Sequence, residues 1–344
     1  MITLTVGFSR NPRLEPLFQG AVKPQHINLE FVYCPPGDLF YRNLRYDEFD
    51  VSEMSISDFL ITRERRDGSK WQWSGLPVFL SKAFLWYTLS ANTNSGIETL
   101  ADLRGKRVAV PDYPMTAAVW MRSFFKELYG INTNEITWYN GRTKDFSHSG
   151  VFGFDKEPPA GITLNWLNES QTMDQMLDRG EIDAAYGIRA VTRKESSGMK
   201  PIDRNGGTQI DGNPRIRPLL KDGGRQITLD YFRKTGVMPS NHMVIVKSAI
   251  LEKHPWIALE LFKTFQRSKE LSYEWAAEMS KAHLMFDGED LKKQSEIYGA
   301  DPYPLGLKAN RKMLELLARC SVEQGLTKKP ANIDELFFPV VRDT

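Results

Sequence analysis

Hydrophobic and polar residues follow a strand–helix rhythm along the first part of the chain. Alternating positions predict strands over residues 2–8, 29–33 and 49–55. Helical spacing predicts helices over residues 12–19, 36–45 and 57–65. Strands that alternate with helices are typical of a parallel sheet covered by helices, so the sequence predicts an α/β fold.

A second unit of the same kind follows. The nearly continuous apolar run over 77–91 predicts either a buried strand pair or one strand that crosses between two lobes. After it, LADLRGKRVAV predicts a short helix, a glycine turn and a strand, and PDYPMTAAVW opens a helix from Thr116 to Tyr129 that ends at Gly130. Further helices are predicted over 171–178, 249–281 and 310–324, and further strands over 182–188 and 241–246.

These elements predict a two-lobed α/β protein, each lobe a mixed sheet flanked by helices. Residues 1–90 and 240–344 are expected to form the first lobe, and residues 91–239 the inserted second lobe. The stretch 140–161 lacks apolar periodicity and predicts a long loop or lid. Ligands bind outside the carboxyl ends of strands in such sheets, so we expect a cleft between the lobes. The loops that would face this cleft are 9–12, 53–57, 112–116, 187–189 and 240–242.

The charge balance narrows the choice of partners. Lys plus Arg number 45 and Asp plus Glu number 43, a net charge of +2, which gives no electrostatic basis for binding nucleic acid or a membrane surface. No run of apolar residues is long enough to span a membrane. The first residues enter a strand pattern at once, and Cys34 and Cys320 lie far apart without a metal-binding spacing. We therefore expect a cytoplasmic protein with reduced thiols, and the oligomeric state stays open, a homo-oligomer included.

Several residues in the expected cleft loops can bind an anion. Arg10 and Arg189 can each hold a carboxylate through two parallel hydrogen bonds, and Arg42 lies one turn into a helix on the same side. The turn that contains Tyr113 and ends at Thr116 leaves the first N–H groups of a helix free for an anion. The alternatives are ordinary surface arginines and a turn in which Thr116 is only a helix cap.

A separate pair of residues, Glu53 and His242, could carry acid–base chemistry. His242 stands at the entry to a predicted strand, and histidine titrates near neutrality, which suits proton transfer; the alternative is a structural histidine. Glu53 could act as a base or orient a histidine, and Ser55 offers a hydroxyl in the same loop. The histidines at 26, 148, 254 and 283 are interpreted as chance placements. Glu53 and His242 leave a divalent metal open, although no spacing requires one. Motifs for serine hydrolases, zinc proteases, P-loops and dinucleotide folds are absent from the sequence.

Several phrases together resemble the 4,5-dihydroxyphthalate decarboxylases, which look like cytoplasmic relatives of type II periplasmic substrate-binding proteins. The similarity covers nearly the whole chain. It rests on EFDVSEMSISDFL, LADLRGKRVAVPDYPMTAAVW, GEIDA, YFRKTGVMPSNHMVIVKSAILEKHPW and ADPYPLGLKANRKMLE. The segments around Glu53, Met115, His242 and Tyr303 are more specific than the binding-protein signatures ADLRGKRVAV and GEIDA.

The resemblance implies decarboxylation of a hydroxylated aromatic diacid, most simply 4,5-dihydroxyphthalate to protocatechuate and CO₂. His242 and Glu53 would then transfer protons, while Arg10, Arg189 and the helix start at Thr116 would hold carboxylates. Ser55 would contact a ring substituent, and Tyr113 and Arg42 would complete the substrate contacts. No organic cofactor is expected, because the hydroxyl-bearing ring can itself act as the electron sink. The rival prediction is a non-catalytic binding protein, a solute receptor or a sensor, for an aromatic carboxylate.

Overall fold

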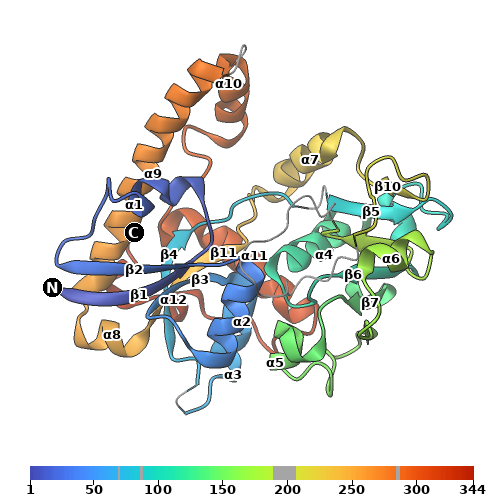
Figure 1. The fold of residues 1–344 in the computed structure, drawn as a ribbon, viewed down its shortest axis with the longest axis horizontal. Helices are drawn as coiled ribbons and strands as arrows, with labels where there is room; N and C mark the ends of the chain where they lie inside the picture. The colour runs from blue at the N-terminus through green and yellow to red at the C-terminus, as the bar shows by residue number, and fades with distance from the viewer. Residues whose placement is uncertain (69, 86–87, 189–206, 284–286) are drawn as a thin grey trace.

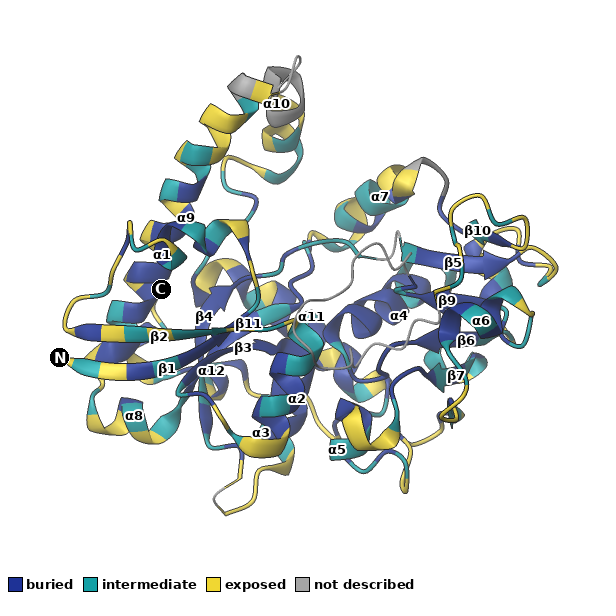
Figure 2. Ribbon diagram, viewed as in Figure 1, coloured by how far each residue is buried: buried dark blue, intermediate teal, exposed yellow. Residues whose placement is uncertain are grey.

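A computed structural model describes residues 1–68, 70–85, 88–188, 207–283 and 287–344. Within them the chain forms two sheets with helices packed around each, and the sheets lie side by side with α4 and α11 between them (Figure 1). The predicted α/β, two-lobed fold class is confirmed. Strand interiors are buried in both lobes, whereas the far end of α9 with α10 projects away from the body (Figures 1 and 2).

The first sheet has the order β2 (Ile27–Tyr33), β1 (Ile2–Phe8), β3 (Val51–Ser55), β11 (His242–Lys247), β4 (Trp73–Phe79). Strand β1 is parallel to β2 and β3, while β11 returns from far along the chain and is antiparallel to both β3 and β4. This insertion of β11 between β3 and β4 places residues from two distant parts of the sequence side by side.

The second sheet has the order β10 (Ile216–Pro218), β5 (Leu89–Asn92), β9 (Ala184–Tyr186), β6 (Arg107–Val110), β7 (Thr137–Asn140), β8 (Leu164–Trp166). Strands β6, β7 and β8 are parallel to their neighbours, and β5 is antiparallel to β9 and β10. Both sheets are therefore mixed, as the sequence predicts.

The helices pack on both sheets and between them (Figure 1). Their bounds are α1 Glu15–Phe18, α2 Pro36–Tyr46, α3 Ile56–Arg65, α4 Thr116–Tyr129, α5 His148–Val151, α6 Met173–Asp178, α7 Arg225–Thr235, α8 Ser248–Lys253, α9 Trp256–His283, α10 Asp287–Tyr298, α11 Leu307–Glu323 and α12 Ile333–Leu336. Among the described helices, none is long and apolar enough to cross a membrane. Cys34 and Cys320 are free thiols.

Helix α4 shows how the sequence sets local structure. It begins and ends at the predicted residues, and Gly130 terminates it in the left-handed conformation, with φ of 64°, which glycine adopts without a steric penalty. Its N-cap is Met115 rather than Thr116, and the Met115 side chain makes no capping hydrogen bond. Thr116 is thus the first helical residue, and its hydroxyl is available for a contact across the lobes.

The apolar run over 77–91 forms two strands in different sheets, since β4 ends at Phe79 and β5 begins at Leu89. Between them the chain crosses from one lobe to the other beside the returning segment. The Leu80 N–H donates to the His242 carbonyl at 3.1 Å, and the Asn241 N–H donates to the Ser81 carbonyl at 2.7 Å. The two crossing segments therefore hydrogen-bond to each other, and His242 lies where they enter the first lobe.

Two other predictions differ from the structure. The helical stretch 249–281 is interrupted between α8 and α9, because Pro255 disfavours helical geometry at the residue before it, where His254 has φ of −137°. The stretch 140–161 is not an irregular loop throughout: it contains a 3₁₀ turn over Lys144–Phe146 and the short helix α5. Ser147 caps α5 by accepting a hydrogen bond from the Gly150 N–H.

Candidate active site

Glu53 and His242 form a buried acid–base pair at the centre of the first sheet. In the antiparallel register of β3 and β11, His242 lies opposite Ser55 and Val244 lies opposite Glu53. His242 Nδ1 lies 2.7 Å from Glu53 Oε1, and the two side chains are 18% and 1% exposed. The Ser9 N–H and hydroxyl both donate to Glu53 Oε2, at 2.9 and 2.5 Å. The carboxylate is therefore held from both sides.

These contacts hold Glu53 in its ionised form. Burial raises the pKa of Glu53, but the hydrogen bonds and charge of His242 together with the Ser9 hydrogen bonds outweigh burial and hold that pKa below its usual range. Glu53 is thus a carboxylate that accepts a hydrogen bond from His242 Nδ1–H. With the proton on Nδ1, the imidazole can offer Nε2 as an acceptor, and Nε2 hydrogen-bonds to none of the described residues. The Phe40 ring packs against the imidazole in a T-shaped arrangement, with 4.8 Å between the ring centroids.

Ser55 and Thr116, both predicted as site residues, are in direct contact across the lobes. Their hydroxyl oxygens lie 2.8 Å apart, and the Ser57 N–H donates to Thr116 Oγ1 at 2.9 Å. Both side chains are buried. The start of α4 is therefore joined to the start of α3, directly beside the strand end that carries His242.

We expect Thr116→Val to lower the free energy of unfolding by about 1–3 kcal/mol, because it leaves the buried Ser57 N–H without its acceptor. Urea denaturation of the purified variant measures this. Thr137→Val is the matched control, because the partly exposed Thr137 lies within β7 and its stability should stay within about 0.5 kcal/mol of wild type. Equal effects of the two substitutions would contradict the assigned role of the Thr116 hydroxyl.

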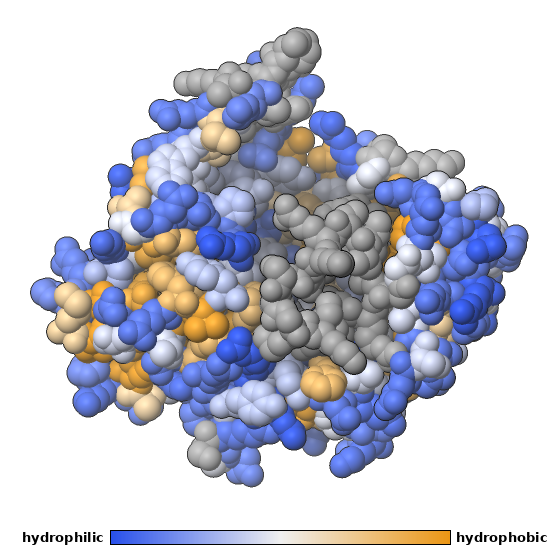
Figure 3. All heavy atoms as spheres, viewed as in Figure 1, coloured by the Kyte–Doolittle hydropathy of each residue, from blue (hydrophilic) through white to orange (hydrophobic). Residues whose placement is uncertain are grey.

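The predicted arginines are not gathered at this pair. The Arg10 guanidinium stacks over the Tyr33 ring at 4.3 Å, and its side chain is 66% exposed. It lies beside β2, where Figure 3 shows hydrophobic side chains gathered over β1 and β2. Arg42 Nε donates to Glu48 at 2.7 Å, which turns its guanidinium toward that carboxylate. Arg189 lies outside the described residues.

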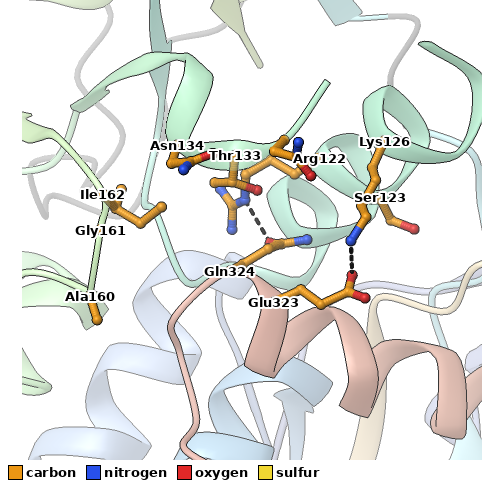
Figure 4. A pocket seen from close by; sticks show the side chains of 11 residues that line it. Arg122, Ser123, Lys126, Thr133, Asn134, Ala160, Gly161, Ile162, Glu323 and Gln324 are labelled. Carbon is orange, nitrogen blue, oxygen red and sulfur yellow. Dashed lines mark hydrogen bonds and ion pairs between the residues drawn. The ribbon is translucent and has the colours of Figure 1, made fainter. Parts of the chain in front are cut away.

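Tyr113 is buried away from the acid–base pair. Its hydroxyl donates to the Gln324 carbonyl at 3.1 Å, and the guanidinium of Arg122 stacks over its ring at 4.1 Å. Arg122 in turn donates to the Gln324 side chain at 2.6 Å, beside a cavity of about 280 Å³ (Figure 4). Tyr113 therefore ties the β6–α4 turn to the end of α11.

The structure places two residues beside the pair that the sequence did not single out. Asn11 Nδ2 donates to the Leu80 carbonyl at 2.8 Å, and the Arg13 guanidinium donates to the same oxygen. Burial lowers the pKa of Arg13, while the charges of nearby groups that include Glu53 oppose this. The charge interaction with Glu53 makes Arg13 a cation in the neighbourhood of the pair, and its guanidinium stacks over the Tyr303 ring at 4.2 Å. No sequence motif distinguishes it from Arg10, three residues earlier.

A second buried histidine, interpreted from the sequence as a chance placement, joins the lobes. His148 Nδ1 lies 2.7 Å from Asp58 Oδ2, and Nε2 lies 3.3 Å from the Gly37 carbonyl and 3.2 Å from an Arg142 nitrogen. The His148 N–H donates to Asp112 at 2.6 Å. Both ring nitrogens face an acceptor, as an imidazolium requires. Burial opposes the charge, but Asp58 and Asp112 outweigh both burial and the Arg142 charge and raise the pKa of His148.

This raised pKa predicts a pH dependence of stability. The stabilisation is fully present below the unfolded value near 6.5 and is lost as the pH rises through the raised, folded pKa. In urea titrations, the free energy of unfolding of wild type should therefore fall more steeply above neutral pH than that of His148→Gln. Parallel pH profiles for the two proteins would contradict a charged His148.

The described residues contain no group of three or more His, Cys, Asp or Glu side chains arranged to hold a metal ion. The chemistry that this site can perform therefore rests, among the described residues, on the Glu53–His242 pair and the adjoining cation Arg13. Such a pair can remove a proton from a bound molecule or return one to it.

Two mixed sheets with connections that cross between them define a two-lobed protein of the periplasmic-binding-protein-like class. A periplasmic aliphatic sulphonate-binding protein from Escherichia coli is similar at a TM-score of 0.52, with 13% identity over 98% of this chain and 92% of that one. A ligand-binding component of an ABC-type import system from Staphylococcus aureus is similar at a TM-score of 0.54, with 12% identity over 100% of this chain and 98% of that one. These likenesses establish the fold.

Two curated relatives are named 4,5-dihydroxyphthalate decarboxylase. The Comamonas testosteroni protein is 27% identical over 340 residues, which cover 98% of this chain and 97% of that protein. The Pseudomonas putida protein is 30% identical over 189 residues, which cover 55% of this chain and 71% of that protein. No family model matches the chain. The chain belongs to the 4,5-dihydroxyphthalate decarboxylase family.

Proposed function

We propose that this protein decarboxylates a hydroxylated aromatic diacid, with 4,5-dihydroxyphthalate as the substrate and protocatechuate and CO₂ as the products. The observation that carries the proposal is the Glu53–His242 pair, in which a fully buried carboxylate fixes the protonated Nδ1 of a partly exposed histidine. A receptor that only grips carboxylates needs donors and cations, whereas this arrangement prepares one ring nitrogen for proton transfer.

The chemistry divides into a deprotonation and a carbon protonation. His242 Nε2 takes the proton of the ring hydroxyl para to the departing carboxylate, and Glu53 stabilises the imidazolium that results. The phenolate electrons then allow the ring carbon that bears this carboxylate to accept a proton from solvent, which gives a dienone. The carbon–carboxylate bond breaks, CO₂ leaves, and the electron pair of that bond restores the aromatic ring as a phenolate. The phenolate takes back the proton held by His242, so the reaction consumes one solvent proton overall. The ring acts as the electron sink, so this route requires no organic cofactor.

The positions of the charged groups support this division of roles. Glu53 is fully buried and bonded to both His242 and Ser9, so we assign it to positioning and charge balance. Arg13 lies beside the pair and is our candidate for the cation that holds a substrate carboxylate. The roles of Arg10, Arg42 and Arg189 in gripping the diacid stay predictions.

The rival function is binding without turnover, and the relatives in fold that are named as binding proteins favour it. The two functions are separated by incubating the purified protein with 4,5-dihydroxyphthalate and following CO₂ release and the appearance of protocatechuate. We expect both products in equal amounts. Thermal stabilisation by the diacid without either product would overturn the enzymatic proposal in favour of a receptor or sensor.

A further inference from the structure

A small cavity lies at the connection between the lobes. It has a volume of about 140 Å³. It is lined by Lys82, which follows β4, by residues 236–238, which follow α7, and by Asp301, Asn310 and Lys312 at or near the start of α11. Lys82 forms an antiparallel bridge with Ser240, two residues before His242. The lining includes neither Glu53 nor His242, so this cavity is separate from the acid–base pair.

Lys82 brings an unpaired positive charge into this cavity. Its residue is only 6% exposed and lines the cavity, and no hydrogen bond or ion pair joins its ammonium to another of the described residues. The nearby carboxylate of Asp301 is already engaged, because it pairs with Lys269 at 2.5 Å and accepts from the Tyr273 hydroxyl at 2.9 Å. A buried cation without a partner is costly, so the cavity is suited to an anion.

Asn310 lines the same cavity and holds an unpaired acceptor just beneath its surface. It is 1% exposed, and its Nδ2 donates to the carbonyls of Pro304 and Gly306 at 2.9 and 2.8 Å. These bonds fix the orientation of the amide, so the remaining atom is the oxygen Oδ1. Oδ1 is buried without a hydrogen-bond partner among the described residues. A ligand that satisfied both groups would accept from Lys82 and donate to Asn310.

The electrostatics of Lys82 agree with this geometry. Burial lowers the pKa of Lys82 to about 8; the charge of Asp301 opposes the change, and the charges of Lys269 and Arg13 add to it. These charged groups leave an excess of positive charge around one engaged carboxylate. A bound anion would relieve this excess and favour the ammonium form.

We propose that this cavity binds a small oxyanion that carries one hydroxyl, of the bicarbonate type. One anionic oxygen would accept from the Lys82 ammonium, and the O–H would donate to Asn310 Oδ1. A volume of about 140 Å³ holds roughly five water molecules, which is ample for such an ion. The proposal goes beyond the decarboxylation and does not depend on it.

Thermal unfolding of the full chain at pH 8 tests the site, with sodium bicarbonate compared with sodium chloride at equal ionic strength. Wild type should gain about 2–4 °C in Tm in a saturable manner. Sodium formate, which lacks the O–H, should stabilise less. Lys82→Met should lose the bicarbonate effect, while Lys308→Met, which changes an exposed lysine of α11, should keep it.

Equal stabilisation of wild type and Lys82→Met would overturn the proposal, and equal stabilisation by formate would overturn the assigned hydroxyl donor.

A second measurement needs no variant. Trace acetylation of wild type at pH 8, followed by mass spectrometry of the peptides, reports the reactivity of individual lysines. Bicarbonate at about ten times its dissociation constant should slow the modification of Lys82 roughly tenfold. Lys308 serves as the internal control and should react at the same rate with either salt. Unchanged reactivity of Lys82 would show that the anion does not occupy the cavity.

Discussion

His242→Gln should reduce the turnover of 4,5-dihydroxyphthalate about 10²- to 10⁴-fold, the range that a positioned acid–base group contributes. The amide of glutamine can hydrogen-bond to Glu53 but cannot accept and release a proton near neutrality. Because His242 lies at the first residue of β11 with its side chain partly exposed, the sheet should form without it. The measurement is kcat from protocatechuate formation, together with the affinity for the diacid by calorimetry.

Two controls make this test specific. His283→Gln changes an exposed histidine at the end of α9 and should leave turnover unchanged. The His242→Gln protein should unfold near the wild-type temperature and bind the diacid with an affinity within a few-fold of wild type. A variant that folds, binds and turns over at the wild-type rate would remove His242 from the mechanism.

Glu53→Gln should also lower kcat strongly, by about 10²- to 10⁴-fold, even though it touches the substrate only through His242. The neutral amide no longer balances the imidazolium that forms when Nε2 takes a proton. It can also turn its NH₂ group toward Nδ1, which favours the wrong tautomer. A loss in kcat with little change in the affinity for the diacid would distinguish this positioning role from a role in binding.

The same substitution should change the response to acid. The folded pKa of Glu53 lies below its usual range, so its ionised form contributes stability above the unfolded pKa, and this contribution is lost as the pH falls through the folded value. The free energy of unfolding of wild type should therefore decrease on the acid side more than that of Glu53→Gln. If both proteins showed the same acid dependence in urea titrations, the hydrogen bonds from His242 and Ser9 would not be holding Glu53 ionised.

The sequence predicted the elements whose signals are local. Strand β1 and helix α4 begin and end as expected, because alternation, helical periodicity and a glycine stop act over a few neighbouring residues. The order of the elements along the chain was enough to predict the fold class. The break between α8 and α9 shows the limit of periodicity, since apolar spacing continues through a proline that interrupts the backbone hydrogen bonds.

The candidate site was predicted only in part. Ser55, Thr116 and His242 are brought together because each lies at the start or end of a strand or helix where the two lobes meet, and Glu53 lies two residues inside β3. Arg13, Lys82 and His148 have no motif around them, and what distinguishes them is burial beside a group far away in the sequence. The sequence also indicated Arg10 and Tyr113 as substrate-binding residues. In the structure the Arg10 guanidinium stacks over an aromatic ring, and the Tyr113 hydroxyl donates to a backbone carbonyl.

The sequence by itself determined the strand–helix order, the α/β class and the residue types that can carry acid–base chemistry, because these depend on local pattern and composition. The tertiary structure decided which of them meet. The pairing of His242 with Glu53 requires β11 to enter the first sheet between β3 and β4 after the chain has built the second lobe. The two residues are 189 positions apart in the sequence. Their contact depends on the register of the sheet and on how the lobes are connected, and no short stretch of residues encodes either of these.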